Sequence, residues 1–586
     1  PRWSRVEETF GEDPVLSGIL GASMVDGLGG GNLSQKYATI ATLKHFLAYA
    51  VPEGGQNGNY ASVGIRDLHQ NFLPPFRKAI DAGALSVMTS YNSIDGIPCT
   101  SNHYLLTQLL RNEWKFRGFV VSDLYSIEGI HESHFVAPTK ENAAIQSVMA
   151  GVDVDLGGDA YTNLCHAVQS GQMDKTVIDT AVCRVLRMKF EMGLFEHPYV
   201  DPKIAAKTVR RKEHIELARK IAQSSITLLK NENSILPLSK TINKVAVIGP
   251  NADNRYNMLG DYTAPQEDSN VKTVLDGILT KLSPFRVEYV RGCAIRDTTV
   301  NEIEQAIEAA RRSEVVIVVV GGSSARDFKT SYKETGAAVA EEGSVSDMEC
   351  GEGFDRASLS LLGRQQELLE SLQKTGKPLI VVYIEGRPLE KNWASEYADA
   401  LLTAYYPGQE GGNAIADVLF GDYNPSGRLP ISVPRSVGQI PVYYNKKAPR
   451  NHDYVEVSSS PLYSFGYGMS YTTFEYSDLQ VVQKSARCFE VSFKVKNTGK
   501  YDGEEVSQLY MRDEYASVVQ PMKQLKHFER FHLKKGEEKK VTFVLTEEDF
   551  FLVNYTLKKV VESGTFQVMI GSSSDDIRLE KSISVE

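Results

Sequence analysis

The stretch GFVVSDLY, residues 118–125, decides the fold, because in it a short apolar strand runs directly into an acid. Small and apolar residues lead without interruption to Ser122 and Asp123, a pattern typical of a parallel strand that is covered on both faces. Loops at the carboxyl ends of such strands build the pockets of many α/β enzymes, so Asp123 is a candidate catalytic residue. An isolated aspartate at a strand end could equally cap the next helix. The neighbouring segments therefore have to decide between the two interpretations.

Three further segments have the same form, an apolar run that ends in polar residues. They are ATLKHF at 41–46, LSVMTSYN at 85–92 and VDVDL at 152–156. Between them, residues 68–82 and 105–114 carry apolar side chains at three- and four-residue spacing, which predicts helices. Alternating strands and helices predict a parallel sheet with right-handed crossovers, whose strand ends converge on one side. The polar residues that this arrangement directs toward one pocket are Lys44, His45, Tyr91 and Asp123.

The pattern restarts after about residue 215 as a second α/β unit. Buried parallel strands are predicted at 244–250, 315–320, 379–385 and 400–406, with helices between them. A loop of roughly 35 residues leads from Gly322 to a helix expected to begin near Leu359, and loops of that length are usually functional or disordered. Composition alone does not choose among the acids of this loop, which are Glu341, Glu342, Asp347, Glu349, Glu352 and Asp355.

The sequence changes character again after an aromatic and glycine-rich connector at 461–471. Period-2 alternation recurs, for example at 489–495 and 541–545, and turn signals separate the alternating runs. Short alternating strands with regular turns predict an antiparallel β-sandwich. Because nothing in this block has the residue types of a catalytic site, we expect it to brace the rest of the chain.

Composition excludes several classes of function. The 586 residues are 42% hydrophobic and carry 64 basic and 74 acidic side chains, for a formal net charge of −10. Nucleic acid and anionic membranes attract basic surfaces, so neither is an expected partner, and no apolar run reaches the roughly 18 residues of a membrane-spanning helix. The six cysteines lack metal-ligand spacing, and the glycine-ended strands at 248–251 and 320–324 do not open helices as nucleotide fingerprints do. We therefore expect a large enzyme without a metal or other cofactor.

Four motifs, in this order, resemble the family 3 glycoside hydrolases. They are PRWSRVEETFGEDP at 1–14, KHF at 44–46, SYN at 90–92 and VSD at 121–123. The resemblance extends to the C-terminus, where the last block is similar to the fibronectin type III-like domain of many such hydrolases. It implies an α/β multidomain protein with a (β/α)8-type barrel over 1–212, an α/β sandwich domain over 213–460 and an antiparallel β-sandwich over 461–586. Relatives have barrel strands upstream of the first motif, so we expect the barrel of this chain to be N-terminally incomplete.

The resemblance also implies the site residues. Asp123 would be the catalytic nucleophile, and the residues that grip the non-reducing sugar would be Arg5, Lys44, His45 and Tyr91. Met88 is expected to line the same pocket, and Leu124, next to the nucleophile, to border its entrance. The segment EGFDR at 352–356 matches the place of the family's general acid/base, which points to Glu352, with Glu349 as the alternative.

These residue types suit the chemistry of a retaining glycosidase. One ionised carboxylate attacks the anomeric carbon and one carboxylic acid protonates the departing oxygen, with the two groups roughly 5 Å apart. Cations near the nucleophile, such as Lys44 and Arg5, would favour its ionised form. We therefore expect an exo-acting, retaining β-glucosidase that hydrolyses a small β-glycoside or oligosaccharide.

Three alternatives stay open or are set aside at this point. The acid/base segment also resembles members that prefer pentoses, so a β-xylosidase is the near alternative. A sugar-binding relative without catalysis, or an inactive truncated form, is the alternative from another class. The N-acetylglucosaminidase subgroup is set aside, because LAYA at 47–50 does not match its histidine-bearing loop. By resemblance we expect a periplasmic or secreted protein, and the sequence predicts no oligomeric state.

Overall fold

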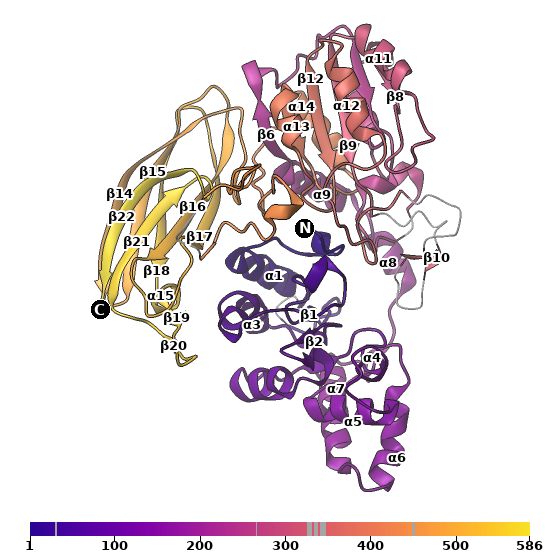
Figure 1. Ribbon diagram of the computed structural model, residues 1–586, viewed down its shortest axis with the longest axis vertical. Coiled ribbons are helices and arrows are strands. Elements are labelled where there is room, and N and C mark those ends of the chain that lie inside the picture. Colours follow the sequence, from indigo (N-terminus) through magenta and orange to yellow (C-terminus); the bar gives the residue numbers. More distant parts are fainter. Residues whose placement is uncertain (30–31, 265, 325–330, 333–337, 340–346, 448–451) are drawn as a thin grey trace. The chain divides into compact units, whose positions relative to one another are not determined.

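A computed structural model describes the chain except for residues 30–31, 265, 325–330, 333–337, 340–346 and 448–451. The predicted candidates Glu341 and Glu342 lie outside the described residues. The described chain forms two compact units (Figure 1). Unit 2 comprises Thr9–Ala205, and unit 1 comprises Pro1–Glu8 together with the described residues from Ala206 onward. The predicted division into three domains at 212/213 and 460/461 stays a prediction.

Unit 2 is built on a parallel sheet of three strands in the order β1-β2-β5. The strands are β1 (Thr42–Phe46), β2 (Ser86–Thr89) and β5 (Phe119–Val121), in a register that aligns Leu43, Val87 and Val120. These strand predictions are confirmed, and parallel pairing puts all three carboxyl ends at one edge. Other elements of the unit are α1 (Pro14–Gly29), α2 (Ile65–Asp67), the π-helical Leu68–Phe72, α3 (Leu73–Asp81), β3 (Ser93–Ile94), β4 (Ile97–Pro98), the π-helical Tyr104–Glu113, α4 (Glu128–Glu132), α5 (Lys140–Ala150), α6 (Leu164–Gln169) and α7 (Lys175–Glu191). α8 (Pro202–Thr208) follows at the boundary between the units.

The predicted strand at 152–156 is wrong. Only one isolated parallel bridge forms there, between Val121 and Val154. The cause is Asp153, whose carboxylate Oδ2 accepts the backbone N–H of Val120 at 2.8 Å. A longer strand at 152–156 would need that N–H for a backbone hydrogen bond to β5. Arg111 and Arg184 each hold the same carboxylate at 2.7 Å. The sheet of unit 2 is therefore open in the described residues, and a closed barrel is not part of the observed fold.

The α/β part of unit 1 is a six-stranded sheet in the order β6-β13-β12-β9-β7-β8. All neighbours pair in parallel except β6, which runs antiparallel to β13. The strands are β6 (Thr227–Asn231), β7 (Val245–Ile248), β8 (Val287–Val290), β9 (Val315–Gly321), β12 (Leu379–Ile384) and β13 (Ala400–Thr403); a separate short pair is β10 (Ser331–Tyr332) with β11 (Ala338–Val339). The four predicted strands are confirmed, and the continuous apolar run of β9 is buried throughout, as expected of a strand covered on both faces.

Helices cover both faces of this sheet (Figure 1). α9 (Lys212–Ser225), α10 (Val274–Leu279) and α14 (Gly411–Leu419) pack on one face, and α11 (Ile303–Arg311), α12 (Gln365–Gln373) and α13 (Asn392–Tyr397) pack on the other. The helix expected to begin near Leu359 begins instead at Gln365. Gly363 explains the delay, because its φ is +60° and a Cβ there would lie 2.6 Å from the carbonyl oxygen of Ile295.

The C-terminal part of unit 1 is the predicted antiparallel sandwich. One sheet has the order β14-β15-β18 and the other β17-β16-β21-β22. The strands are β14 (Phe474–Ser485), β15 (Cys488–Asn497), β16 (Gly503–Asp513), β17 (Gln524–Leu533), β18 (Glu538–Leu545), β21 (Gly564–Gly571) and β22 (Ile577–Val585); α15 (Glu547–Phe550), β19 (Leu552–Val553) and β20 (Lys559–Val560) lie in the connection after β18.

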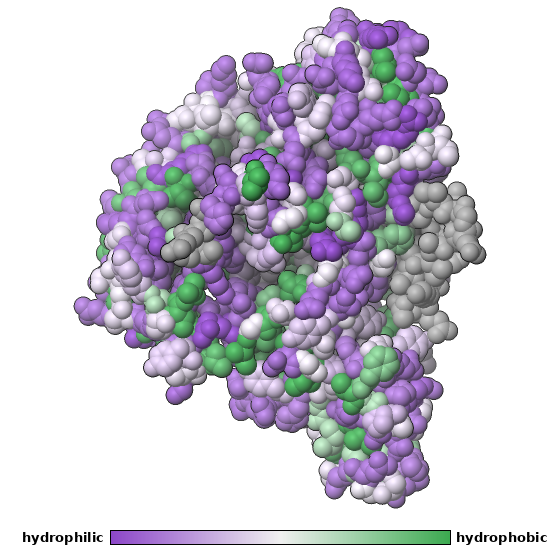
Figure 2. Space-filling model, viewed as in Figure 1, coloured by the Kyte–Doolittle hydropathy of each residue, from purple (hydrophilic) through white to green (hydrophobic). Residues whose placement is uncertain are grey.

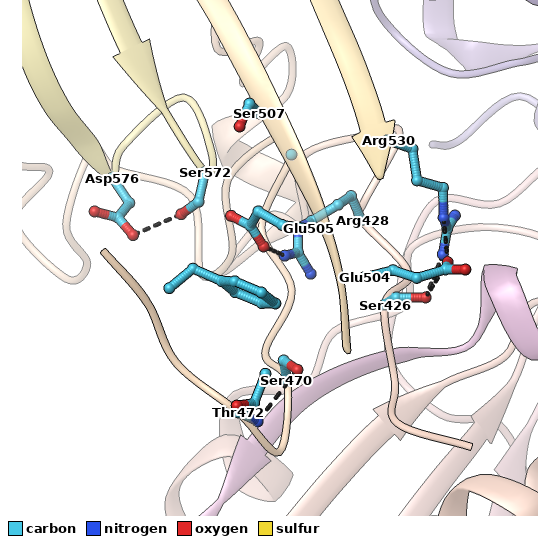
Figure 3. A network of polar contacts seen from close by, with 12 residues as sticks. Ser426, Arg428, Ser470, Thr472, Glu504, Glu505, Ser507, Arg530, Ser572 and Asp576 are labelled. Atoms are coloured by element: carbon cyan, nitrogen blue, oxygen red, sulfur yellow. Dashed lines mark hydrogen bonds and ion pairs between the residues drawn. The ribbon is translucent and has the colours of Figure 1, made fainter. Parts of the chain in front are cut away.

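An ion pair and hydrogen bonds join the sandwich to the α/β part within unit 1 (Figure 3). Arg428 lies 2.7 Å from the carboxylate of Glu505, which is 1% exposed and also accepts from Tyr476 Oη at 2.7 Å. Arg530 on β17 bonds Glu504, at 2.6 Å, and Ser426. A buried charge pair is costly to break, so this contact fixes the sandwich on its neighbour.

Polar and charged residues dominate the face of the molecule in Figure 2, and the apolar patches between them are small. Among the described residues, we find no helix with the length and apolar character needed to cross a membrane.

Candidate active site

Asp123 lies on the loop directly after β5, at the carboxyl edge of the unit 2 sheet. Its side chain is buried, with the residue 7% exposed, and Oδ1 accepts the backbone N–H of Leu124 at 2.8 Å. Oδ2 lies 3.4 Å from Nε2 of His45, which comes from the end of β1. The structure therefore brings together an acid and an imidazole that are far apart in the sequence, at the strand edge where they were predicted.

Two aromatic rings, those of Tyr49 and Tyr91, lie beyond His45 in this cluster of residues. The ring of Tyr49 packs edge-on against His45 with centroids 4.8 Å apart, and the ring of Tyr91 lies 6.0 Å from Tyr49. The backbone oxygen of Tyr91 bonds a ring nitrogen of His134 at 2.8 Å. Tyr49 was not predicted, although its position four residues after His45 in a short polar-to-aromatic run is a signal that could have found it.

The other predicted residues of unit 2 flank Asp123 on its sheet. Met88 is half-buried on β2 and pairs in register with Val121, two residues before the acid. The side chain of Leu124 packs against Gly157. A Cβ on Gly157 would lie 2.5 Å from the leucine side chain, and the φ of Gly157 is +74°, so only glycine fits at this position. Lys44 is exposed on β1, next to His45 in the chain.

Glu352, the predicted acid/base, belongs to unit 1 and is 5% exposed. Its Oε1 accepts from Nη1 of Arg5 at 3.0 Å, its Oε2 accepts from the hydroxyl of Tyr262, and its backbone N–H bonds Oδ2 of Asp261 at 3.1 Å. Arg5 is held in turn by Glu8, through contacts of 2.5 and 2.9 Å. Arg5 thus lies with the predicted acid/base in unit 1, whereas Lys44, His45, Met88, Tyr91 and Leu124 lie with Asp123 in unit 2.

The alternative acid, Glu349, has a different environment. It is 3% exposed, and its Oε2 contacts Nη1 of Arg356 at 2.8 Å and Nε of Arg387 at 3.5 Å. Two guanidinium groups therefore neutralise this carboxylate inside the domain. Such a group is suited to holding the segment in place rather than to exchanging a proton with a substrate.

Segment 1–8 supports the Glu352 segment through backbone contacts. The backbone N–H of Ser4 bonds Asp355 at 2.8 Å, and the N–H of Gly351 bonds the carbonyl oxygen of Ser4 at 3.1 Å. Arg387 donates to the carbonyl oxygens of Pro1 and Arg2 at 3.0 and 2.9 Å. These bonds explain why residues 1–8, the first part of the first motif, belong to unit 1.

Sequence reasoning missed Glu8, Asp261 and Tyr262. The i,i+3 spacing of Arg5 and Glu8 is a charge pattern that could have suggested their pairing. No local signal marks Asp261 or Tyr262, which come from the loop after β7. Burial, and secondarily the bond to Glu352, raises the pKa of the Tyr262 phenol above its usual range, so the hydroxyl remains a donor to this carboxylate.

Comparison with models of protein families gives three matches. Residues 1–188 match the glycosyl hydrolase family 3 N terminal domain, residues 226–471 match the glycosyl hydrolase family 3 C-terminal domain, and residues 505–574 match a fibronectin type III-like domain. Together these matches span both units and include every predicted site residue.

Individual relatives match over nearly the whole chain. A beta-xylosidase of Formosa agariphila is 39% identical over 98% of this chain and 80% of its own, and the periplasmic beta-glucosidase of Salmonella typhimurium is 37% identical over 99% and 78%. The crystal structure of beta-glucosidase from Listeria innocua in complex with isofagomine is similar with a TM-score of 0.91 at 34% identity, over 100% of this chain and 80% of that one. The chain therefore belongs to glycosyl hydrolase family 3 and is a glycoside hydrolase.

Proposed function

We propose that the protein is a retaining, exo-acting β-glycosidase that removes terminal non-reducing β-D-glucosyl residues from small glycosides or oligosaccharides. The observation that carries this proposal is the buried carboxylate of Asp123, at the carboxyl edge of a parallel sheet and 3.4 Å from His45. Relatives named beta-glucosidase support the substrate class, and the Listeria innocua enzyme has also been solved in complex with glucose.

In the proposed reaction Asp123 attacks the anomeric carbon while Glu352 gives a proton to the departing glycosidic oxygen. The bond between carbon and aglycone breaks as the bond to Asp123 forms, which leaves a covalent glycosyl-enzyme. Glu352, now ionised, takes a proton from water, which attacks the same carbon and releases the sugar with its configuration retained.

Glu352 is preferred to Glu349 as the acid because of its contacts. Its carboxylate meets one arginine and the phenol of Tyr262, a residue that is 48% exposed, so the group lies next to solvent-accessible surface. The carboxylate of Glu349 meets two buried arginines instead. Arg5 and the charged or aromatic residues Lys44, His45 and Tyr91 would bind sugar hydroxyls or a sugar face, with Met88 and Leu124 as apolar neighbours.

β-Xylosidase activity is the second candidate function. It is favoured by the beta-xylosidase of Formosa agariphila, which is 39% identical over almost the whole chain. Glucose and xylose differ by the hydroxymethyl group at C5, so the two activities differ in what fills that space.

The open sheet of unit 2 is proposed to be part of a (β/α)8-type barrel, in agreement with the parallel pairing of β1, β2 and β5. The three domains of the sequence analysis are proposed with it. A periplasmic or secreted location is proposed from the relative named as a periplasmic beta-glucosidase.

The test is hydrolysis of aryl β-D-glucoside and aryl β-D-xyloside by the wild type, by Asp123→Asn and by a matched control, Asp179→Asn, whose aspartate is exposed on α7. We expect turnover by the wild type and the control, with a loss of about 10³-fold or more in kcat for Asp123→Asn. A 2-fluoro aryl glucoside should label Asp123 covalently, which mass spectrometry of the peptide would detect. An unchanged rate in Asp123→Asn would overturn the nucleophile assignment. A wild type that binds glucose without hydrolysing either substrate would favour the non-catalytic alternative.

A further inference from the structure

Arg387 lies just after β12 and is completely buried, at 0% exposure. Its guanidinium group donates to four backbone carbonyl oxygens at 2.8–3.0 Å, those of Pro1, Arg2, Glu349 and Phe354. Nη1 holds the first two oxygens and Nη2 the last two, so each nitrogen uses both of its N–H groups. Hydrogen bonds from a charged donor are strong, which suits this group to holding two segments of backbone together. The proposed reaction gives Arg387 no role.

The four carbonyl oxygens come from two segments of unit 1, and each segment contains a proposed active-site residue. Glu349 and Phe354 lie three residues before and two residues after Glu352, so one guanidinium group fixes the backbone on both sides of the proposed acid. The other two oxygens begin the segment that carries Arg5, whose Nη1 donates to the Glu352 carboxylate at 3.0 Å. Arg387 therefore binds the backbone of both partners of this ion pair.

A buried ion pair fixes the turn that carries Arg387. Oε2 of Glu385 accepts from Nζ of Lys391 at 2.7 Å and from the backbone N–H of Leu389 at 3.1 Å. Its Oε1 accepts from the hydroxyl of Thr403 on β13 at 2.6 Å. Glu385 and Lys391 are each 1% exposed. Because this pair joins the chain before and after position 387, the backbone that carries the guanidinium group is held from both sides.

The preceding residue, Gly386, lets both segments approach the end of β12. A Cβ on Gly386 would lie 2.3 Å from Oε2 of Glu7 and 2.8 Å from the sulfur of Cys350. Glu7 belongs to segment 1–8 and Cys350 to the acid/base segment, and Sγ of Cys350 donates to the carbonyl oxygen of Ser4 at 3.1 Å. The two segments therefore meet at the point where Arg387 binds them.

We infer that Arg387 is a positioning residue that sets the place of Glu352 relative to Arg5. Its contacts hold the acid/base segment and segment 1–8 in one arrangement, with the Arg5 guanidinium beside the Glu352 carboxylate. Loss of these contacts would displace the acid, so proton donation to the leaving group would suffer more than attack by the nucleophile. This inference rests on the proposed role of Glu352 as the acid, and it adds a residue that acts only through the backbone.

The first test compares Arg387→Lys with Arg428→Lys, the same change at a buried arginine that binds the sandwich. Lysine keeps the positive charge near Glu349, but its donors share one nitrogen and cannot reach two pairs of carbonyl oxygens. We expect Arg387→Lys to lower kcat/KM on alkyl glucosides about tenfold more than on activated aryl glucosides, because good leaving groups need little protonation. Arg428→Lys should leave the ratio of the two rates unchanged. Since a loss of folded protein scales both rates equally, an unchanged ratio in Arg387→Lys would overturn the positioning role.

A double variant separates this inference from the proposed function. If Arg387 acts through the acid, Arg387→Lys should change the ratio of the two rates in the wild-type background but not in Glu352→Ala. An equal change in both backgrounds would overturn the inference and leave the acid assignment intact. A wild-type ratio in Glu352→Ala itself would overturn the acid assignment, and the inference with it.

The second test does not depend on activity. Hydrogen exchange is measured at one pH for the wild type and both lysine variants over residues 1–6 and 350–356, which backbone hydrogen bonds link to each other. We expect several-fold faster exchange in both stretches for Arg387→Lys and wild-type exchange for Arg428→Lys. Wild-type exchange in Arg387→Lys would overturn the inference. Faster exchange in a chain that hydrolyses no glycoside would support the link between the segments and overturn the proposed function alone.

Discussion

Two glutamates on one short segment, Glu349 and Glu352, differ in their neighbours, and the neighbours decide what each carboxylate can do. Glu349 faces Arg356 and Arg387 inside the domain. Glu352 faces Arg5 and the hydroxyl of Tyr262. The first arrangement fixes a negative charge in place, whereas the second leaves a carboxyl group beside a half-exposed ring, where it can exchange protons with a bound molecule.

Substitution of the proposed acid should depend on the leaving group. Glu352→Ala should reduce kcat/KM on alkyl glucosides by about 10²-fold or more and on activated aryl glucosides far less, because good leaving groups need little protonation. Azide should restore part of the rate by attacking the glycosyl-enzyme. Paired kinetics on the two substrate classes check this, and equal losses on both would contradict the acid role.

The matched change Glu349→Gln should instead lower thermal stability, since it leaves buried Arg387 without its anion.

At the residue scale, the sequence predicts one half of the candidate site better than the other. Asp123 could be found because the strand and its terminal acid are contiguous, and its partner His45 ends a neighbouring strand. The partners of Glu352 could not be found in this way, because Arg5 is 347 positions away and Tyr262 is 90 positions away. Contacts between distant loops depend on how the chain packs, and no local periodicity records them.

At the scale of elements, the acid/base segment depends on glycine. Gly351 has φ +88° and Gly353 has φ +92°, so the backbone on both sides of Glu352 lies in the left-handed region. A Cβ on Gly351 would lie 3.1 Å from Oδ2 of Asp261 and 3.2 Å from Cβ of Ser324. A side chain at position 351 would therefore force the Asp261 carboxylate or Ser324 to shift.

Gly351→Ala should shift the segment and lower kcat by about tenfold, with a smaller effect on KM. Gly376→Ala is the matched control: its φ is +69°, yet nothing lies within 4 Å of the added Cβ. Both variants carry the strain of a left-handed alanine, about 1–2 kcal/mol, so their difference isolates the close approach. Steady-state kinetics and thermal unfolding of both variants provide the comparison, and equal kcat values in the two would contradict the argument.

Strand prediction succeeds for continuous apolar runs and fails for a short mixed edge strand and where a side chain replaces a ladder bond. β9 and β12 are buried along their whole lengths and read as continuous apolar runs. The edge strand β8 is half-buried or exposed at each residue, and its short mixed sequence gave no strand signal. At 152–156 the apolar alternation was present, but the Asp153 carboxylate takes the backbone N–H of Val120 and a single bridge forms, at Val154. Side-chain competition of this kind is invisible to hydrophobic periodicity.

At the scale of the whole molecule, the sandwich is joined to the α/β part by buried charge. Arg428→Ala would leave the buried carboxylate of Glu505 without its ion-pair partner, which should destabilise the contact by about 3–5 kcal/mol. Calorimetry should show the sandwich unfolding at a lower temperature, while kcat at 25 °C stays close to the wild-type value. Arg487→Ala, which removes an exposed pair with Glu547, is the control and should cost about 1 kcal/mol or less. Identical transitions in the two variants would contradict the proposed brace.

The inclusion of Pro1–Glu8 in unit 1 has a consequence for synthesis of the chain on the ribosome. Ser4 and Gly351 form a backbone bond, and side-chain bonds between Ser4 and Asp355 and between Arg5 and Glu352 span similar separations of 351 and 347 positions. Unit 2 lies between these partners in the sequence. At roughly 5–20 residues per second, translation from one partner to the other takes roughly 20–70 s. Unit 2 can fold cotranslationally during that interval, whereas segment 1–8 must wait for the acid/base segment to emerge. A chaperone or protease that captures the waiting segment would therefore compete directly with assembly of the proposed acid.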